Sequence, residues 1–231
     1  MTNDYSYIRK NFEELRDEIA SLAAKIGTKV PTLVAVTKSG TDEELLELVR
    51  AGATDIGENR PQEVKRRKEL IESAGLSVRM HEIGTLQRNK VKMVIDKAAL
   101  IHSVDSYKLA YDIDRLAEKN GIMMPILIEV NSASEECKGG VLPEDTERLV
   151  NEILELKNVK LVGLMTMGPV SETAEDLRGY FRLTKKLFDE LSEKYGFGDD
   201  PILSMGMSDS YRVAIEEGST LVRVGRKLFI K

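Results

Sequence analysis

Short apolar runs alternate with longer amphipathic stretches along the whole chain, and this order constrains the fold more than any other feature. TLVAVTK at 32–38 is typical of a buried strand, and the stretch at 42–51 that follows it has helical spacing. Because repeated strand-then-helix order builds parallel sheets with right-handed crossovers, we predict an α/β protein. The predicted strands are 32–38, 54–58, 78–84, 99–105, 124–132, 159–167, 201–206 and 220–225, and the predicted helices are 5–25, 42–51, 61–74, 88–95, 107–119, 144–156, 173–194 and 209–217.

The number of these units favours a closed barrel. About eight strand–helix units in 231 residues, with one extra helix in front, fit a single (β/α)8 TIM-like barrel. A doubly wound open sheet is the structural alternative, because periodicity does not reveal whether a sheet closes. The linkers are short and no low-complexity stretch interrupts the chain, so we expect one domain over residues 1–231.

Composition narrows the classes of function. The net charge of −5 comes from interspersed acidic and basic residues, which argues against a nucleic-acid or membrane surface. Cys137 is the single cysteine, so we expect no intrachain disulfide and no cysteine-rich zinc site. The N-terminus lacks the apolar core of a secretory signal, and no apolar run approaches the length of a membrane span. We expect a cytoplasmic monomer.

Lys38 is the sharpest candidate among the polar residues at strand ends, where barrels bind their ligands. Side chains alternate along a strand, so Lys38 shares a face with Val34 and Val36. If those two fill the barrel interior, Lys38 projects into the mouth. We expect it to be partly desolvated there, which favours the neutral amine that attacks a carbonyl. The alternative is a lysine that extends from a strand end into water.

The segment LSMGMSDS at 203–210 is the second candidate. Gly206 allows a tight turn, and Ser208 or Asp209 can cap the helix that follows. Backbone N–H groups at that helix start, with the Ser208 hydroxyl, form a site for an anion or phosphate. Plain helix capping without a ligand is the alternative.

The last predicted strand, TLVRVG at 220–225, is the third candidate. Arg223 interrupts an otherwise apolar run, so its guanidinium needs a partner, either a protein carboxylate or a ligand. A core salt bridge is the alternative that needs no ligand. Gly225 permits close backbone approach directly after it.

These three candidates converge if the barrel is closed, because its first and last strands are then neighbours. Lys38 supplies an amine, the turn at Ser208 a phosphate cradle, and Arg223 a cation. That combination describes a phosphorylated aldehyde held as a Schiff base.

Eight stretches spread over nearly the whole chain carry a further signal. They are VAVTK around Lys38, GENRPQE (57–63), HEIGTLQRNK (81–90), IHSVDS (101–106), VNSASEECKGG (130–140), VGLMTMG (162–168), LSMGMSDS (203–210) and STLVRVG (219–225). In this order the chain resembles the pyridoxal-phosphate homeostasis proteins, which are relatives of the alanine racemase barrel domain. The stretches are specific only together.

The resemblance implies a fold-type III barrel that binds pyridoxal 5′-phosphate through a Schiff base with Lys38. It places Arg223 opposite the pyridine nitrogen, and a lysine matching Lys138 near the mouth as a secondary contact. The remaining residues that it assigns hold the phosphate (Ser208, Gly225 and Arg226) or line the pocket (Asn59 and Met207).

The chain also departs from the pattern of that family around the mouth. Arg226 and Lys227 replace small or uncharged residues, and Arg226 adds positive charge beside a phosphate. The other departures are Arg60 and Pro61 for an aromatic and a small apolar residue, Glu82 for an apolar aromatic residue, Thr85 for proline, and the lack of a glycine after Phe229. The Schiff-base assignment does not depend on them.

Two functions of different classes follow from this resemblance. The first is a carrier that binds and buffers the cofactor for apo-enzyme recipients without turnover. The second is an amino-acid racemase or lyase with Lys38 as base. An arginine opposite the ring nitrogen leaves that nitrogen largely neutral, and hence the cofactor a weaker electron sink. The sequence ends at Lys231, so we expect the racemase domain that supplies the second base to be absent, which favours the carrier.

Other classes have less support. A barrel enzyme acting on a phosphorylated sugar would use the same phosphate site, with Lys38 as base. No nucleotide-binding motif or nucleophile elbow occurs, and a Ser–His–Asp hydrolase would need one of the two histidines, His81 or His102, beside a serine. These two histidines could ligate a metal, but no other residues have metal-ligand spacing. We interpret His102 as a packing residue at a strand end, and we expect no metal.

Overall fold

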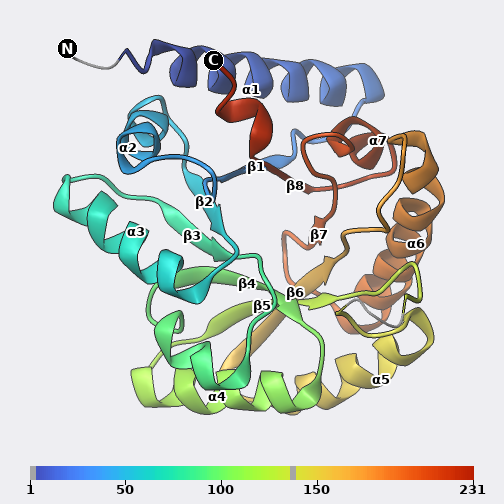
Figure 1. Cartoon of the computed structure of the whole chain (residues 1–231). Coiled ribbons are helices and arrows are strands. Elements are labelled where there is room, and N and C mark those ends of the chain that lie inside the picture. The colour runs from blue at the N-terminus through green and yellow to red at the C-terminus, as the bar shows by residue number, and fades with distance from the viewer. Residues whose placement is uncertain (1–3, 136–138) are drawn as a thin grey trace.

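The computed structural model describes residues 4–135 and 139–231, which form a closed barrel of parallel strands (Figure 1). Each strand pairs with the next, and the last pairs with the first, so the predicted TIM-like barrel is confirmed and the open sheet is wrong. The strands are β1 (Thr32–Val36), β2 (Asp55–Glu58), β3 (Arg79–Glu82), β4 (Ala98–Val104), β5 (Met124–Glu129), β6 (Val159–Met165), β7 (Ile202–Ser204) and β8 (Leu221–Val224).

The helices follow the strands largely as predicted. They are α1 (Ser6–Ile26), α2 (Asp42–Arg50), α3 (Pro61–Ser73), α4 (Tyr107–Asn120), α5 (Pro143–Leu154), α6 (Arg178–Tyr195) and α7 (Tyr211–Glu216). Two predictions need correction. The segment after β3 is a 3₁₀ helix, η1 (Arg88–Met93), and a 3₁₀ turn, η2 (Glu175–Leu177), precedes α6. Such short connectors often adopt this tighter helix, which apolar periodicity does not distinguish from an α-helix.

The extra helix α1 packs beside the last part of the chain rather than within a strand–helix unit (Figure 1). Its buried residues Ile8, Phe12, Leu15 and Ile19 recur every three or four positions, as predicted. The 3₁₀ helix η3 (Arg226–Leu228) contacts α1, and the Asn11 amide donates to the Ile230 carbonyl at 2.7 Å. Helix α1 thereby holds the segment that follows β8.

Alternation along the strands separates an interior from an outer core. Val34, Leu100, Leu127, Met165 and Leu221 form a small apolar cluster in the barrel, as predicted for Val34. The larger core lies between the strands and the helices. Two positions further along three of these strands, toward the mouth, the interior residue is polar: His102, Glu129 and Arg223. The interior is therefore apolar only in part.

A pair of buried carboxyl groups lies outside the barrel, between β2, β3 and α3. Glu58 and Glu82 are register partners, and both are fully buried. Glu58 accepts a hydrogen bond from Thr37 and lies 3.1 Å from Arg67 Nε. Glu82 accepts only the Gly84 N–H, and its second oxygen has no hydrogen-bond partner among the described residues. Burial, assisted by the Glu58 charge, raises the pKa of Glu82 to about 8.

Among the described residues, we find no helix with the length and apolar character that a membrane crossing requires.

We expect Glu82→Gln to stabilise the fold, and more so at pH 8 than at pH 5. The pKa of Glu82 is about 8 in the folded chain and near its ordinary 4.5 in the unfolded chain. The unfolded state therefore releases a proton between these values while the folded state retains it, so the free energy of unfolding falls as pH rises. Glutamine mimics the protonated acid and removes this loss, on the order of a few kcal/mol at pH 8.

Thermal unfolding at both pH values checks this expectation, with the exposed Glu69→Gln on α3 as the control. Equal changes in Tm for the two variants at pH 8 would contradict it.

Candidate functional site

The turn after β7 is shaped by Gly206, which has a left-handed φ of 93°. A Cβ on this residue would lie 2.5 Å from the Ala214 Cβ and 2.9 Å from the Tyr211 Cα. Helix α7 begins at Tyr211, and neither Ser208 nor Asp209 caps it. The predicted capping is therefore wrong: the Ser210 hydroxyl instead accepts from the Met207 N–H at 3.1 Å, which closes the turn onto itself.

Ser208 joins this turn to the one that follows β8. Its buried hydroxyl accepts from the Gly225 N–H at 3.2 Å. Gly225 also passes close to β1, because a Cβ there would lie 2.9 Å from the Val36 carbonyl oxygen. The ends of β1, β7 and β8 therefore meet, as the convergence argument predicts.

Several backbone N–H groups in these two turns donate to no acceptor within the described residues, among them those of Ser208, Asp209, Arg226 and Lys227. Backbone N–H groups require partners when water is excluded, and a cluster of them is a site for an anion. The residues present therefore fit a phosphate group. The Arg226 side chain pairs with Asp209 across the rim, and both are exposed.

Lys38 lies in the turn just beyond β1, which is flanked by β2 and β8. Its side chain is exposed, so the prediction of a partly desolvated lysine is wrong. The strand ends at Val36, two residues earlier than predicted. Among the described residues, no hydrogen bond or ion pair occupies the Lys38 amine.

Arg223 is buried inside the barrel at the level of Val34. Its Nη1 donates to the Ser204 carbonyl at 2.9 Å and to the Ser204 hydroxyl at 2.5 Å, and its Nη2 donates to the Thr166 carbonyl at 3.1 Å. No carboxylate in the described part of the chain forms an ion pair with it, so the core salt bridge is wrong. Burial lowers the pKa of Arg223 to about 10, and the negative charge of Glu129 opposes that shift.

Glu129, at the end of β5, is a site residue that sequence reasoning did not identify. It is buried, and its pKa is raised to about 7 by burial and by the charge of Asp105, against the effect of Arg223. A carboxyl group that titrates near neutral pH inside the mouth changes the net charge beside Arg223.

The two predicted pocket-lining residues lie on opposite sides of Lys38. Asn59 follows β2 and is exposed, in a hollow of about 560 Å³ that also involves Thr85 and Lys90. Met207 follows β7 and is exposed. Lys138, the predicted secondary contact, lies outside the described residues.

His81 and His102 have buried side chains inside the barrel. His102 lies within β4, two residues before its end, so the predicted strand-end position needs correction, while its burial agrees with a packing role. His102 is fully buried and makes hydrogen bonds to both His81 and Ser204. His81 also bonds to Asp55, at the opposite end of the barrel from the mouth. Among the described residues, no group of three or more His, Cys, Asp or Glu side chains could hold a metal ion.

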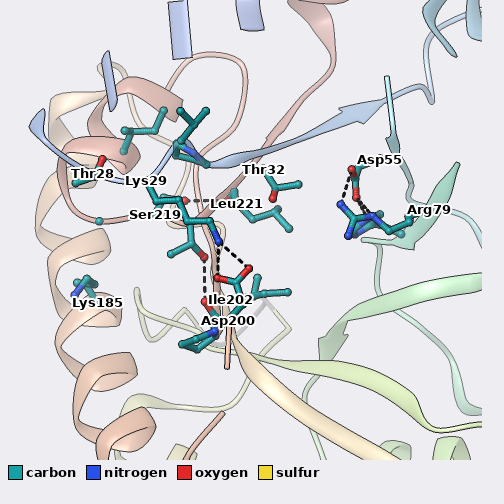
Figure 2. Close-up of a pocket in the computed structure, with 17 residues that line it drawn as sticks. Thr28, Lys29, Thr32, Asp55, Arg79, Lys185, Asp200, Ile202, Ser219 and Leu221 are labelled. Atoms are coloured by element: carbon teal, nitrogen blue, oxygen red, sulfur yellow. Dashed lines mark hydrogen bonds and ion pairs between the residues drawn. The ribbon is translucent and has the colours of Figure 1, made fainter. Parts of the chain in front are cut away.

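A second hollow, of about 310 Å³, lies at that opposite end (Figure 2). The first residues of five strands line it: Thr32, Asp55, Arg79, Ile202 and Leu221. Figure 2 shows the Asp55–Arg79 pair on one wall and the Lys29–Asp200 pair on another. Because its cations are already paired, we do not assign this hollow to the anion site.

The chain matches known proteins along almost its whole length. The family described as the alanine racemase N-terminal domain matches residues 10–230. A pyridoxal phosphate homeostasis protein of Aquifex aeolicus is 45% identical over 203 residues, which are 88% of this chain and 88% of that protein. One from Helicobacter pylori is 38% identical over 199 residues, which are 85% of this chain and 86% of that protein. This chain belongs to the pyridoxal phosphate homeostasis protein family.

Solved structures agree with this family. PipY of Synechococcus elongatus, solved without PLP, superposes with a TM-score of 0.86 at 30% identity, covering 96% of this chain and 100% of that chain. PipY with PLP bound has a TM-score of 0.84 at 28% identity, over the same shares of the two chains. An alanine racemase of Clostridium difficile, at 15% identity and a TM-score of 0.74, shares the fold, and the match covers 99% of this chain and 59% of that one. The predicted alanine-racemase-like barrel is confirmed.

We expect Gly206→Ala to destabilise the barrel by about 1–3 kcal/mol, because alanine is strained at a left-handed φ and its Cβ would press on α7. Thermal unfolding measures this loss. Gly179→Ala is the matched control, since a Cβ there meets nothing within 4 Å and α6 favours alanine over glycine. A Tm for Gly206→Ala that equals the wild-type value would contradict the expectation.

Proposed function

We propose that this member of the pyridoxal phosphate homeostasis family binds pyridoxal 5′-phosphate at the barrel mouth, and carries and buffers it without sustained turnover. The names of its relatives and the PLP-bound structure of PipY support this function. When bound, the cofactor supplies an aldehyde for Schiff-base formation and a phosphate for anchoring.

The observation that carries the proposal is the cluster of unpaired N–H groups in the turns after β7 and β8. Ser208, Asp209, Arg226 and Lys227 each present an N–H without an acceptor in the described chain. Gly225 keeps the second turn close to β1. A phosphate provides strong acceptor oxygens, so it satisfies several of these donors at once.

In this proposal Lys38 supplies the amine for the Schiff base. Its exposed position lets a cofactor arrive from solution and leave again, as a carrier requires. Asn59 and Met207 flank the bound ring, and Arg226 contributes its backbone N–H while its side chain stays paired with Asp209. Lys138 remains a proposed secondary contact.

Arg223 favours carriage over catalysis. An arginine opposite the pyridine nitrogen donates a hydrogen bond and keeps its own proton, so the ring nitrogen stays largely neutral. A neutral ring withdraws electrons weakly and stabilises carbanions poorly. The proposal also includes one functional domain over residues 1–231, a monomer, a cytoplasmic location and transient contact with apo-enzymes that receive the cofactor.

We expect the purified protein to develop an absorbance band near about 420 nm when PLP is added, the position typical of the lysine Schiff base. Lys38→Ala should lose the band because the acceptor amine is gone. Lys65→Ala, which removes an exposed amine on α3, is the control and should keep it. An unchanged band in Lys38→Ala would contradict the assignment, and no band in the wild type would favour the phosphorylated-sugar enzyme.

The second candidate function is an amino-acid racemase or lyase that uses Lys38 as base, and the shared fold of the alanine racemase favours it. If the protein is a carrier, we expect the PLP-loaded protein to catalyse no sustained exchange of the α-proton of L- or D-amino acids in deuterated water. NMR of the amino acids measures this exchange. Turnover above that of free PLP, lost in Lys38→Ala, would favour the racemase.

A further inference from the structure

A chain of buried hydrogen bonds crosses the barrel interior. Asp55 Oδ1 lies 2.9 Å from His81 Nε2, and His81 Nδ1 lies 2.9 Å from His102 Nε2. His102 Nδ1 lies 3.0 Å from the Ser204 hydroxyl, which accepts from Arg223 at 2.5 Å. Because these residues come from β2, β3, β4, β7 and β8, the link from His102 to Ser204 spans the interior from one wall to another.

The charge at each end of this series of hydrogen bonds fixes the donor in its first and last bonds. Although burial raises the pKa of Asp55, hydrogen bonds from His81, Arg79 and Thr54 outweigh it and lower that pKa to about 2. An ionised Asp55 only accepts, so His81 Nε2 must carry a proton. At the other end, Arg223 only donates, so the Ser204 oxygen accepts from it.

The protonation of the two histidines between these ends sets the direction of the two inner hydrogen bonds. Burial lowers the pKa of His102 well below its ordinary value, and the positive charge of Arg223 acts in the same direction, so His102 is neutral. Where the His81 ring carries one proton, that proton lies on Nε2 toward Asp55, and its Nδ1 then accepts from His102 Nε2–H. His102 Nδ1 then accepts the Ser204 O–H. Each donor therefore points from Arg223 toward Asp55, and the bonds polarise one another.

The charged groups at the two ends of this hydrogen-bond series are consistent with this donor direction. Arg79 pairs with Asp55 at the far end, while Glu129 is the acidic group whose charge acts on Arg223 at the mouth. A guanidinium has five N–H donors, and Ser204 and Thr166 take three of them within the described chain. One Nη2 proton and the Nε proton remain to face a ligand.

We propose that Asp55, His81, His102 and Ser204 are positioning residues, which orient the Arg223 guanidinium toward the barrel mouth through this one-directional chain. They do not deliver a proton to the cofactor, because arginine does not give up its own. The proposal deepens the proposed function, since it states what sets the cation opposite the ring nitrogen. It also connects the mouth to the hollow at the other end, where Asp55 forms part of the wall (Figure 2).

The direct test is the tautomer of each imidazole in the protein without added cofactor. The chain has two histidines, so long-range ¹H–¹⁵N correlation resolves both. We expect two neutral Nε2–H imidazoles at pH 7. An Nδ1–H tautomer or a doubly protonated ring at either position would overturn the donor direction.

The second test measures PLP binding and absorbance in Ser204→Ala and Asp55→Asn. Ser204→Ala removes an acceptor of Arg223, and we expect affinity to fall about tenfold, the size of one hydrogen bond to a charged group. Asp55→Asn acts at the opposite end, and we expect a loss of about threefold in the same direction. Ser219→Ala is the matched control, because among the described residues its buried hydroxyl bonds only to backbone carbonyls, and it should bind as the wild type does.

The outcomes separate this inference from the proposed function. Wild-type affinity and an unshifted band in both variants would overturn the positioning role, even if Tm falls. If the wild type binds no PLP, the proposed function fails. The tautomers in the free protein then still test the direction of the hydrogen bonds from Arg223 to Asp55. Two Nε2–H rings would then support it, and any other pair would overturn it.

Discussion

The buried guanidinium of Arg223 is the constraint on which the barrel interior depends. A cation in the interior of a barrel requires acceptors, and here they come from the ends of β6 and β7, through the Thr166 carbonyl and the two oxygens of Ser204. Its own N–H bonds to the Gly206 carbonyl at 3.0 Å. One residue thereby connects three successive strands at the mouth. The apolar cluster in the rest of the interior is small.

The geometry at the rim follows from the same strands. Gly206 turns the chain after β7, which places the Ser208 hydroxyl against the Gly225 N–H. The N–H groups beside this contact point away from any acceptor in the described chain, which is an arrangement suited to a bound anion. Lys38 extends into solvent from the turn that follows the neighbouring strand, β1. A firmly built anion site beside an exposed amine suits a protein that holds a ligand and exchanges it.

Much of this fold could be predicted from apolar periodicity, because barrel strands and covering helices carry different periods. The closure of the barrel could only be inferred from the number of units, and the 3₁₀ helix η1 was indistinguishable from an α-helix by pattern. The site at Lys38, Ser208 and Arg223 was predicted to converge because β1 and β8 are neighbours in a closed barrel. The exposure of Lys38 agrees with the alternative drawn from the sequence, a lysine that extends from a strand end into water, and periodicity alone could not choose between the two.

The series of hydrogen bonds inside the barrel was not predicted, for a different reason. Asp55, His81, His102 and Ser204 are far apart in sequence, and their side chains meet only across the closed barrel. One sequence feature did indicate a polar interior near the mouth: in β4, β5 and β8 a polar residue stands two positions beyond an interior leucine. Glu129 was missed because it lies immediately before VNSASEECKGG, the stretch in which the family resemblance was sought.

The most direct test of the whole account is to trap the cofactor on the protein and locate it. The protein is mixed with PLP, reduced with borohydride so that a Schiff base becomes a stable secondary amine, and then digested for mass spectrometry. The account predicts that the pyridoxyl group is found predominantly on Lys38. Label concentrated on another lysine, such as Lys138, with Lys38 unmodified, would contradict it.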